Sequence, residues 1–133
     1  MGMASDEAGK DRIVRVLVVD DQVPFRQAAK AVCEVTPGVE VVGEAASGEE
    51  AVDLADELDP DIVLMDYRLP GMDGLAATRA ITTAHPQTRV LLLSTYPAED
   101  IPGDVRDAGA VAYVHKEAFG PDVLEDLVHS DAA

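Results

Sequence analysis

The sequence predicts an α/β fold in which a five-stranded parallel sheet is covered by helices on both faces. Five short runs rich in Val, Ile and Leu alternate with helical patterns along the 133 residues. Short apolar runs bounded by turn residues are typical of strands buried on both faces of a parallel sheet. The alternation favours βαβ connections, and the chain length suits one domain with its own core.

The expected elements follow from hydrophobic periodicity and from residues that start or stop helices. In chain order they are a polar, flexible leader over 1–12, strand 13–19, helix 24–35, strand 39–45, helix 48–58, strand 61–65, helix 74–84, strand 89–93, strand 110–114, helix 121–129 and a tail over 130–133. One domain over residues 13–129 therefore accounts for nearly the whole chain.

Turn and capping residues place the boundaries in the first half of the chain. The first helix has one apolar face and ends before Pro37 and Gly38, which break it. Ser47, with Glu50 three residues later, forms a capping box that opens the second helix. The Asp-Pro pair at 59–60 ends that helix, because Pro disfavours helical backbone in the residue before it.

The second half contains one irregular element. Asp73 is the expected N-cap of the third helix, and Pro121 fits the first position of the last helix. A fourth helix is expected between the fourth and fifth strands, where Pro97 could occupy the first turn. The Pro-Gly pair at 102–103 falls further inside, where a proline costs about 3 kcal/mol. We therefore expect this helix to be short, shifted or partly unwound.

Composition excludes several classes of protein. The net charge is −16 and no cluster of Lys and Arg occurs, so direct contact with nucleic acid by this chain is disfavoured. The apolar runs are too short to span a bilayer, and residues 1–12 lack the apolar stretch of a signal peptide. Cys33 is the only cysteine, which points to a reducing cytoplasm and, for Cys33 itself, to a small apolar role on a helix.

Acidic residues follow two of the predicted strands. Asp20 and Asp21 come directly after the first strand, and Asp66 ends the third. If these strands are neighbours, three carboxylates meet in one crevice at the carboxyl edge of the sheet, where open α/β sheets bind ligands. Their repulsion is relieved by a hard cation such as Mg²⁺, and a carboxylate beside Mg²⁺ can accept a phosphoryl group.

The order and spacing of these acids and of several other residues resemble the receiver domain of bacterial two-component response regulators. The resemblance covers about residues 13–128 and rests on the acid pair Asp20-Asp21, Asp66, the turn Pro70–Gly74, Ser94, the Gly109-Ala110 dipeptide, Tyr113 and Lys116. Each residue alone has an ordinary structural explanation: an acid pair often caps a helix, and a lysine is usually solvated. Together and in order, the motifs are specific.

The resemblance implies a flavodoxin-like (CheY-like) doubly wound sheet of order 2-1-3-4-5 with five helices. It also implies that Asp66 is the phosphoacceptor. Mg²⁺ would be held by Asp21, Asp66 and the backbone carbonyl of Arg68, with Asp20 acting mainly through metal-bound water. Lys116 would contact one phosphoryl oxygen, as suits an ammonium point charge.

A conformational switch is implied as well. Ser94 would bind another phosphoryl oxygen, with Thr95 as a rival for that role. Movement of Ser94 would free space for the Tyr113 ring to turn inward, although Tyr113 could equally be a static core aromatic.

The implied function is a phosphorylation-activated switch that exposes a protein-binding surface. Its phosphodonor would be a histidine kinase or a phosphotransfer protein, its output partner is unknown, and phosphorylation could drive homodimerisation. Such a domain phosphorylates and dephosphorylates itself and is not a conventional turnover enzyme. In detail the chain looks most like receivers of the LuxR/FixJ type, which carry a helix-turn-helix output domain.

The sequence also allows alternatives to a lone receiver that is switched by phosphorylation. The chain could be an excised receiver of a DNA-binding regulator rather than a lone receiver, or an interaction module that does not use phosphate. A phosphohydrolase of the haloacid-dehalogenase type is disfavoured, because that family needs an acid two residues after the nucleophile and Arg68 stands there.

Overall fold

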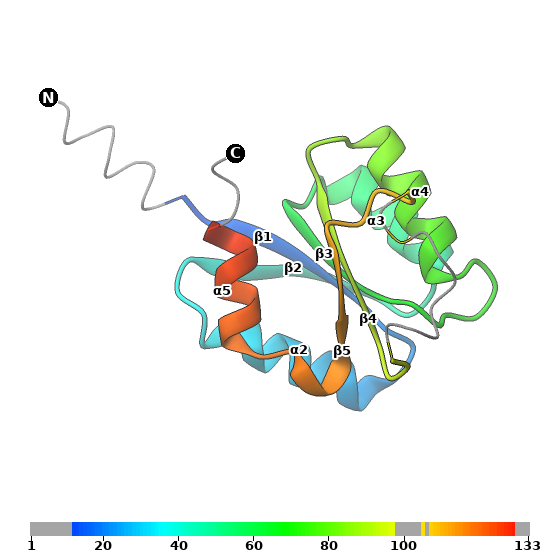
Figure 1. Ribbon diagram of the computed structural model, residues 1–133. Helices are drawn as coiled ribbons and strands as arrows, with labels where there is room; N and C mark the ends of the chain where they lie inside the picture. The colour runs from blue at the N-terminus through cyan, green and yellow to red at the C-terminus, as the bar shows by residue number, and fades with distance from the viewer. Residues whose placement is uncertain (1–11, 98–104, 106, 130–133) are drawn as a thin grey trace, which may run out of the picture.

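The computed structural model describes residues 12–97, 105 and 107–129 (Figure 1). Within these residues, five strands form one parallel sheet in the order β2-β1-β3-β4-β5, which confirms the predicted sheet. The strands are β1 (Val14–Val19), β2 (Val39–Ala45), β3 (Ile62–Asp66), β4 (Arg89–Ser94) and β5 (Ala112–His115). The helices are α2 (Val23–Glu34), α3 (Gly48–Leu58), α4 (Gly74–Ala84) and α5 (Pro121–His129), with a short 3-10 turn η2 (Lys116–Ala118).

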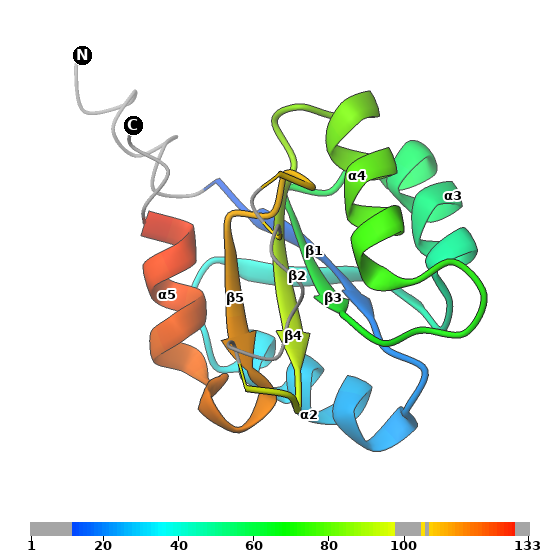
Figure 2. The same ribbon diagram turned by 45° about the vertical axis from the view of Figure 1, so that its right-hand side comes forward.

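Helices cover both faces of the sheet. Figures 1 and 2 show α3 and α4 together on one face and α2 and α5 on the other. Each face buries its own apolar cluster, one joining α3 and α4 to Leu17, Val63 and Leu92, the other joining α2 and α5 to Val18 and Leu64. Adjacent strand residues thus point to opposite cores, which explains the runs of consecutive apolar residues in β1, β3 and β4.

The predicted helix starts are confirmed by their caps. The Ser47 side chain accepts a hydrogen bond from the Glu50 amide at 3.1 Å, and Asp73 accepts from the Ala76 amide at 2.8 Å. Asp59 ends α3 in the left-handed region, with φ of 49°. The Ser47 and Asp73 side chains each satisfy a backbone donor that the first helical turn leaves free.

Four strands differ by one or two residues from their predicted ends, and the first of them begins at Val14 rather than Ile13. The third and fourth strands each extend one residue further, to Asp66 and Ser94, because Asp66 pairs with Leu93 across the ladder and Ser94 pairs with the fifth strand. The fifth strand begins at Ala112 rather than Ala110, since the Ala110 amide bonds back to the preceding turn. Hydrogen-bond partners across the sheet decide these ends, and local composition does not reveal them.

Several predicted segments lie mostly or wholly outside the described residues. Most of the interrupted fourth helix (98–104 and 106), nearly all of the leader and the tail lie outside the described residues. No helix in the described part of the chain is long and apolar enough to cross a lipid bilayer.

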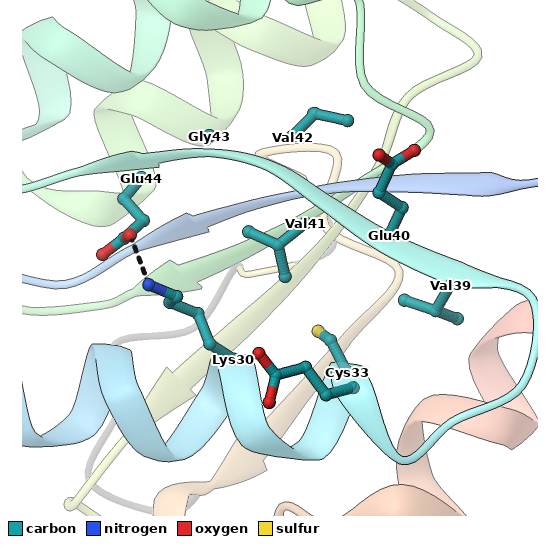
Figure 3. Close-up of a pocket in the computed structure, with 9 residues that line it drawn as sticks. Lys30, Cys33, Val39, Glu40, Val41, Val42, Gly43 and Glu44 are labelled. Carbon is teal, nitrogen blue, oxygen red and sulfur yellow. Dashed lines mark hydrogen bonds and ion pairs between the residues drawn. The ribbon is translucent and has the colours of Figure 1, made fainter.

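Cys33 lies on α2 beneath the edge strand β2. Figure 3 shows its sulfur near Val41, in a groove that also contains an ion pair between Lys30 and Glu44 at 2.8 Å. Burial, reinforced by the charge of Glu34, raises the pKa of the Cys33 thiol to about 11. A thiol held neutral in this way behaves as a small apolar group, as the sequence predicts.

Candidate functional site

Three acidic side chains meet at the carboxyl edge of the sheet. One carboxylate oxygen from each of Asp20, Asp21 and Asp66 lies within 4.8 Å of the others. β1 and β3 are adjacent and parallel, so their carboxyl ends reach the same edge. Asp20 and Asp66 are buried, whereas Asp21 is exposed, so the cluster opens to solvent on one side.

Asp20 is fixed by its surroundings. Its carboxylate accepts a hydrogen bond from the Gln22 amide at 2.7 Å, and its carbonyl accepts one from Arg26 Nη1 at 2.6 Å. Arg26 also pairs with Glu44 at 3.2 Å and so joins the first turn of α2 to β2. The acid pair therefore does not act as a side-chain N-cap of α2, because Gln22 is the cap residue and makes no side-chain cap bond.

Lys116 lies directly above the acids. It follows β5, and its ammonium nitrogen is 2.6 Å from Asp20 Oδ2 and 3.5 Å from Asp66 Oδ1. The same nitrogen lies 4.5 Å from the ring centroid of Phe25. The structure thus brings a lysine 96 residues away from Asp20 into the acidic crevice, which offsets part of the negative charge.

The surroundings of Asp66 disfavour its ionisation. Burial, followed by the negative charge of Asp20, raises the pKa of Asp66 to about 6. Lys116 and the Arg68 amide, which donates to Asp66 Oδ1 at 3.3 Å, act in the opposite direction. Desolvation prevails because the carboxylate has lost nearly all contact with water.

The turn after β3 packs tightly against the same strand. A Cβ added at Gly74 would lie 2.2 Å from the Asp66 carbonyl oxygen, so only glycine fits at the start of α4. The Pro70–Gly74 turn of the sequence therefore has a steric role beside Asp66.

Ser94 and Tyr113 meet through a residue that the sequence analysis did not single out. Ser94 is buried, and its hydroxyl accepts a hydrogen bond from the Tyr96 amide at 3.1 Å. The Tyr113 hydroxyl donates to the Tyr96 carbonyl. The Arg68 guanidinium lies over the Tyr96 ring, 5.2 Å from its centroid, and donates to its hydroxyl. Tyr96 thus links both predicted switch residues to the turn that follows Asp66.

Thr95, the rival of Ser94, has a different position. Thr95 is exposed, and its backbone carbonyl oxygen lies 2.9 Å from His115 Nε2. Phe25 and Arg26 are the other site neighbours that the sequence did not reveal. An aromatic four residues after the acid pair is only a weak sequence signal, because Phe25 also fits the apolar face of α2.

The donor set suits a hard divalent cation. Three carboxylates that each offer an oxygen within a few ångströms are the ligands that Mg²⁺ prefers, and the exposed side leaves room for the waters that it retains. The described residues near the cluster provide no histidine or thiol ligand of the kind that Zn²⁺ favours.

Comparison with known proteins identifies the family of this chain. Residues 16–129 match the response regulator receiver domain family. The chain is 36% identical over 115 residues to the transcriptional regulatory protein LiaR of Bacillus subtilis, covering 86% of this chain and 54% of LiaR. It is 47% identical over 105 residues to a protein-glutamate methylesterase/protein-glutamine glutaminase of Alkalilimnicola ehrlichii, covering 77% of this chain and 27% of that protein.

A solved structure has a similar fold. The two-component response regulator of the LuxR family from Aurantimonas sp. SI85-9A1 superposes with a TM-score of 0.82 at 33% identity, covering 90% of this chain and 86% of that one. The chain spans about half or less of the length of these two curated relatives. Receivers of this family typically bind Mg²⁺ in an acidic pocket and accept phosphoryl groups from histidine kinases. The chain belongs to the response regulator receiver domain family of two-component signal transduction, a family whose members work by phosphorylation.

Proposed function

We propose that Asp66 accepts the phosphoryl group and that this reaction switches a protein-binding surface. The observation that carries the proposal is the single crevice holding Asp20, Asp21 and Asp66 beneath the Lys116 ammonium. Phosphoryl transfer depends on positioning and on stabilisation of charge, and side chains at or just after the ends of β1, β3 and β5 would supply both.

The reaction forms one bond and breaks another. A carboxylate oxygen of Asp66 attacks the phosphorus of the donor, and the bond from phosphorus to the donor atom breaks with its electron pair leaving on the donor. Lys116 stabilises a phosphoryl oxygen by its charge, and the Ser94 hydroxyl donates a hydrogen bond to another. A movement of the Ser94 hydroxyl towards that oxygen would take it away from the Tyr96 amide, from which it accepts a hydrogen bond.

Mg²⁺ is the proposed cofactor. Asp21, Asp66 and the backbone carbonyl of Arg68 would hold it directly, and Asp20 would hold it mainly through water. When bound, the cation neutralises charge on the carboxylates and on the phosphoryl oxygens. Lys116 also pairs with Asp20, so the cation and the lysine would together balance the negative charge of the acids.

The switch would then run through Tyr96. Rotation of Ser94 removes a hydrogen bond from the Tyr96 amide, and Tyr113 is bound to the carbonyl of the same residue. A new position of Tyr96 would release the Tyr113 hydroxyl and allow the ring to turn inward. Phosphate then shifts a population because its contacts with Ser94 differ between the two states.

The partners follow from this role. The donor would be a histidine kinase or a phosphotransfer protein in the cytoplasm, and the output would be a contact with another protein or domain, with homodimerisation as one form. The domain would modify itself rather than turn over a substrate. Residues 13–129 would form the receiver, with 1–12 and 130–133 as its flanks. A transcriptional output is a second candidate because LiaR is a transcriptional regulatory protein, although a net charge of −16 disfavours direct DNA contact by this chain.

Intact mass spectrometry with acetyl phosphate and Mg²⁺ tests the proposal. Wild type should gain one phosphoryl group, and Asp66→Ala should gain none. Asp53→Ala, which removes an exposed acid from α3, is the matched control and should react like wild type. Equal labelling of the Asp66→Ala variant would reject the assignment, and a wild type that never reacts would favour a phosphate-independent interaction module.

A further inference from the structure

The Lys116 ammonium is enclosed by three groups. Asp20 and Asp66 lie on one side at 2.6 and 3.5 Å, and the face of the Phe25 ring lies on another, 4.5 Å from nitrogen to centroid. The lysine side chain is only 14% exposed. An ammonium has three donor directions, and here an aromatic face takes the place that water would otherwise occupy.

Phe25 is held by regular structure on both sides. It lies in the first turn of α2, immediately after the segment that carries Asp20 and Asp21. Its side chain packs against the apolar cluster that α2 and α5 form with the sheet. The ring is therefore fixed by a helix and by the core, whereas the lysine stem is long and flexible.

In the described part of the chain, two cations lie over aromatic rings. Among residues 12–97, 105 and 107–129, Arg68 lies over Tyr96 and Lys116 lies over Phe25. The first of these pairs is exposed, whereas the second is largely desolvated by the site. Desolvation strengthens the attraction between a cation and the negative face of a ring.

We infer that Phe25 is a positioning residue for phosphoryl transfer, acting through Lys116. This inference rests on the proposed function, which assigns Lys116 to a phosphoryl oxygen. When the ammonium leaves Asp20 for that oxygen, the ring remains beside it and limits the rotamers that the lysine can adopt. Fewer unproductive positions raise the rate of transfer, because orientation of a stabilising charge is part of the barrier.

Replacement of the ring separates this role from simple packing. Phe25→Leu keeps an apolar side chain and removes the aromatic face, so we expect phosphorylation by saturating acetyl phosphate to slow by roughly three- to tenfold. Phe25→Tyr keeps the face and should remain within about twofold of wild type. Phe119→Leu is the matched control, since Phe119 is the other of two phenylalanines and packs against the same core cluster; its rate should also stay within about twofold.

A double-mutant cycle identifies Lys116 as the intermediary. If Phe25 acts through the lysine, Phe25→Leu should have no further effect on the rate once Lys116→Met is present. In one-dimensional or ¹³C-edited NMR of the unphosphorylated protein, the Lys116 ε-methylene protons should show a ring-current shift in wild type and Phe25→Tyr that disappears in Phe25→Leu. Thermal unfolding of each variant checks that it is folded, and Phe25→Met replaces Phe25→Leu if the latter is not.

The outcomes separate the proposed function from the positioning role of Phe25. A wild type that is not phosphorylated overturns the proposed function itself. A wild type that reacts, with Phe25→Leu equally fast or Phe119→Leu equally slowed, overturns the positioning role alone. The positioning role is also overturned if Phe25→Leu slows phosphorylation as much in the Lys116→Met background as in wild type, because the ring would then act without the lysine.

Discussion

Asp66 combines two properties that oppose each other. Its proposed role as a nucleophile requires an ionised carboxylate, yet only 4% of this residue is exposed and its pKa is raised to about 6 by burial and by Asp20. Ionisation at neutral pH therefore destabilises the fold. Under the proposed function this cost is useful, because the same crevice would hold the groups that phosphoryl transfer requires.

The pKa of Asp66 predicts a pH-dependent gain from neutralising it. The folded pKa of about 6 exceeds the reference of 3.8, so the folded state binds this proton more tightly than the unfolded state, and that contribution to stability is lost as pH rises through 6. In EDTA, Asp66→Asn should raise the free energy of unfolding by about 1–3 kcal/mol at a pH of about 7.5. The gain should vanish below a pH of about 4, where both states are protonated.

Urea denaturation at the two pH values measures this difference. Asp21→Asn is the control, because Asp21 is exposed and its neutralisation should stabilise less. A variant at Asp66 that is no more stable than wild type at either pH would mean that lost contacts with Lys116 outweigh the relief of the buried charge.

At the scale of elements, one contact joins two loops across the site. Arg68 belongs to the loop between β3 and α4, and Tyr96 follows β4; their side chains meet through a ring contact and a hydrogen bond. The backbone of Tyr96 holds Ser94 and Tyr113 at the same time. The pair therefore stabilises this arrangement of Ser94 and Tyr113, the two residues of the proposed switch.

Loss of this contact should favour the activated state. Arg68→Met removes the guanidinium but leaves the backbone carbonyl, so we expect beryllofluoride with Mg²⁺ to bind about two- to fivefold more tightly, a small change because the pair is exposed. Titration followed by NMR of Tyr113 gives the affinity, with Arg79→Met on the exposed face of α4 as the control. Weaker binding would show instead that the guanidinium contacts the phosphoryl analogue.

At the scale of the whole molecule, negative charge dominates. Ten basic residues face twenty-six acidic ones, for a net charge of −16. Some acids are paired, as Glu44 is with Arg26 and Lys30, and the Lys30 hydrogen bond is the main cause that lowers the pKa of Glu44. Most of the excess is unbalanced, and such self-repulsion destabilises a compact state.

Salt should therefore stabilise this protein. Raising NaCl from about 0.05 to about 0.5 M shortens the Debye length to a few ångströms and should raise the melting temperature by several degrees. Asp66→Asn should retain most of this response, since it removes one charge among many. Differential scanning calorimetry at fixed pH measures the effect, and a melting temperature that falls with salt would show that exposed pairs such as Lys30–Glu44 outweigh the repulsion.

The sequence by itself determined the number of strands and the helix caps at Ser47 and Asp73, and it predicted the meeting of Asp20, Asp21 and Asp66 on the condition that the first and third strands are neighbours. These features follow from local chemistry. Caps depend on neighbours three residues away, and any adjacent parallel strands bring their carboxyl ends to one edge.

Only the tertiary structure decided which groups touch. It placed Lys116 closer to Asp20 than to Asp66, the Phe25 ring beside that ammonium, and Tyr96 between Ser94 and Tyr113. Except for the hydrogen bond between Tyr96 and Ser94, these contacts join residues far apart in the chain, and they depend on rotamers that packing selects among several of similar energy. Periodicity and spacing along the sequence do not reveal these side-chain contacts, because the contacts form only when separate strands and helices pack together at the site.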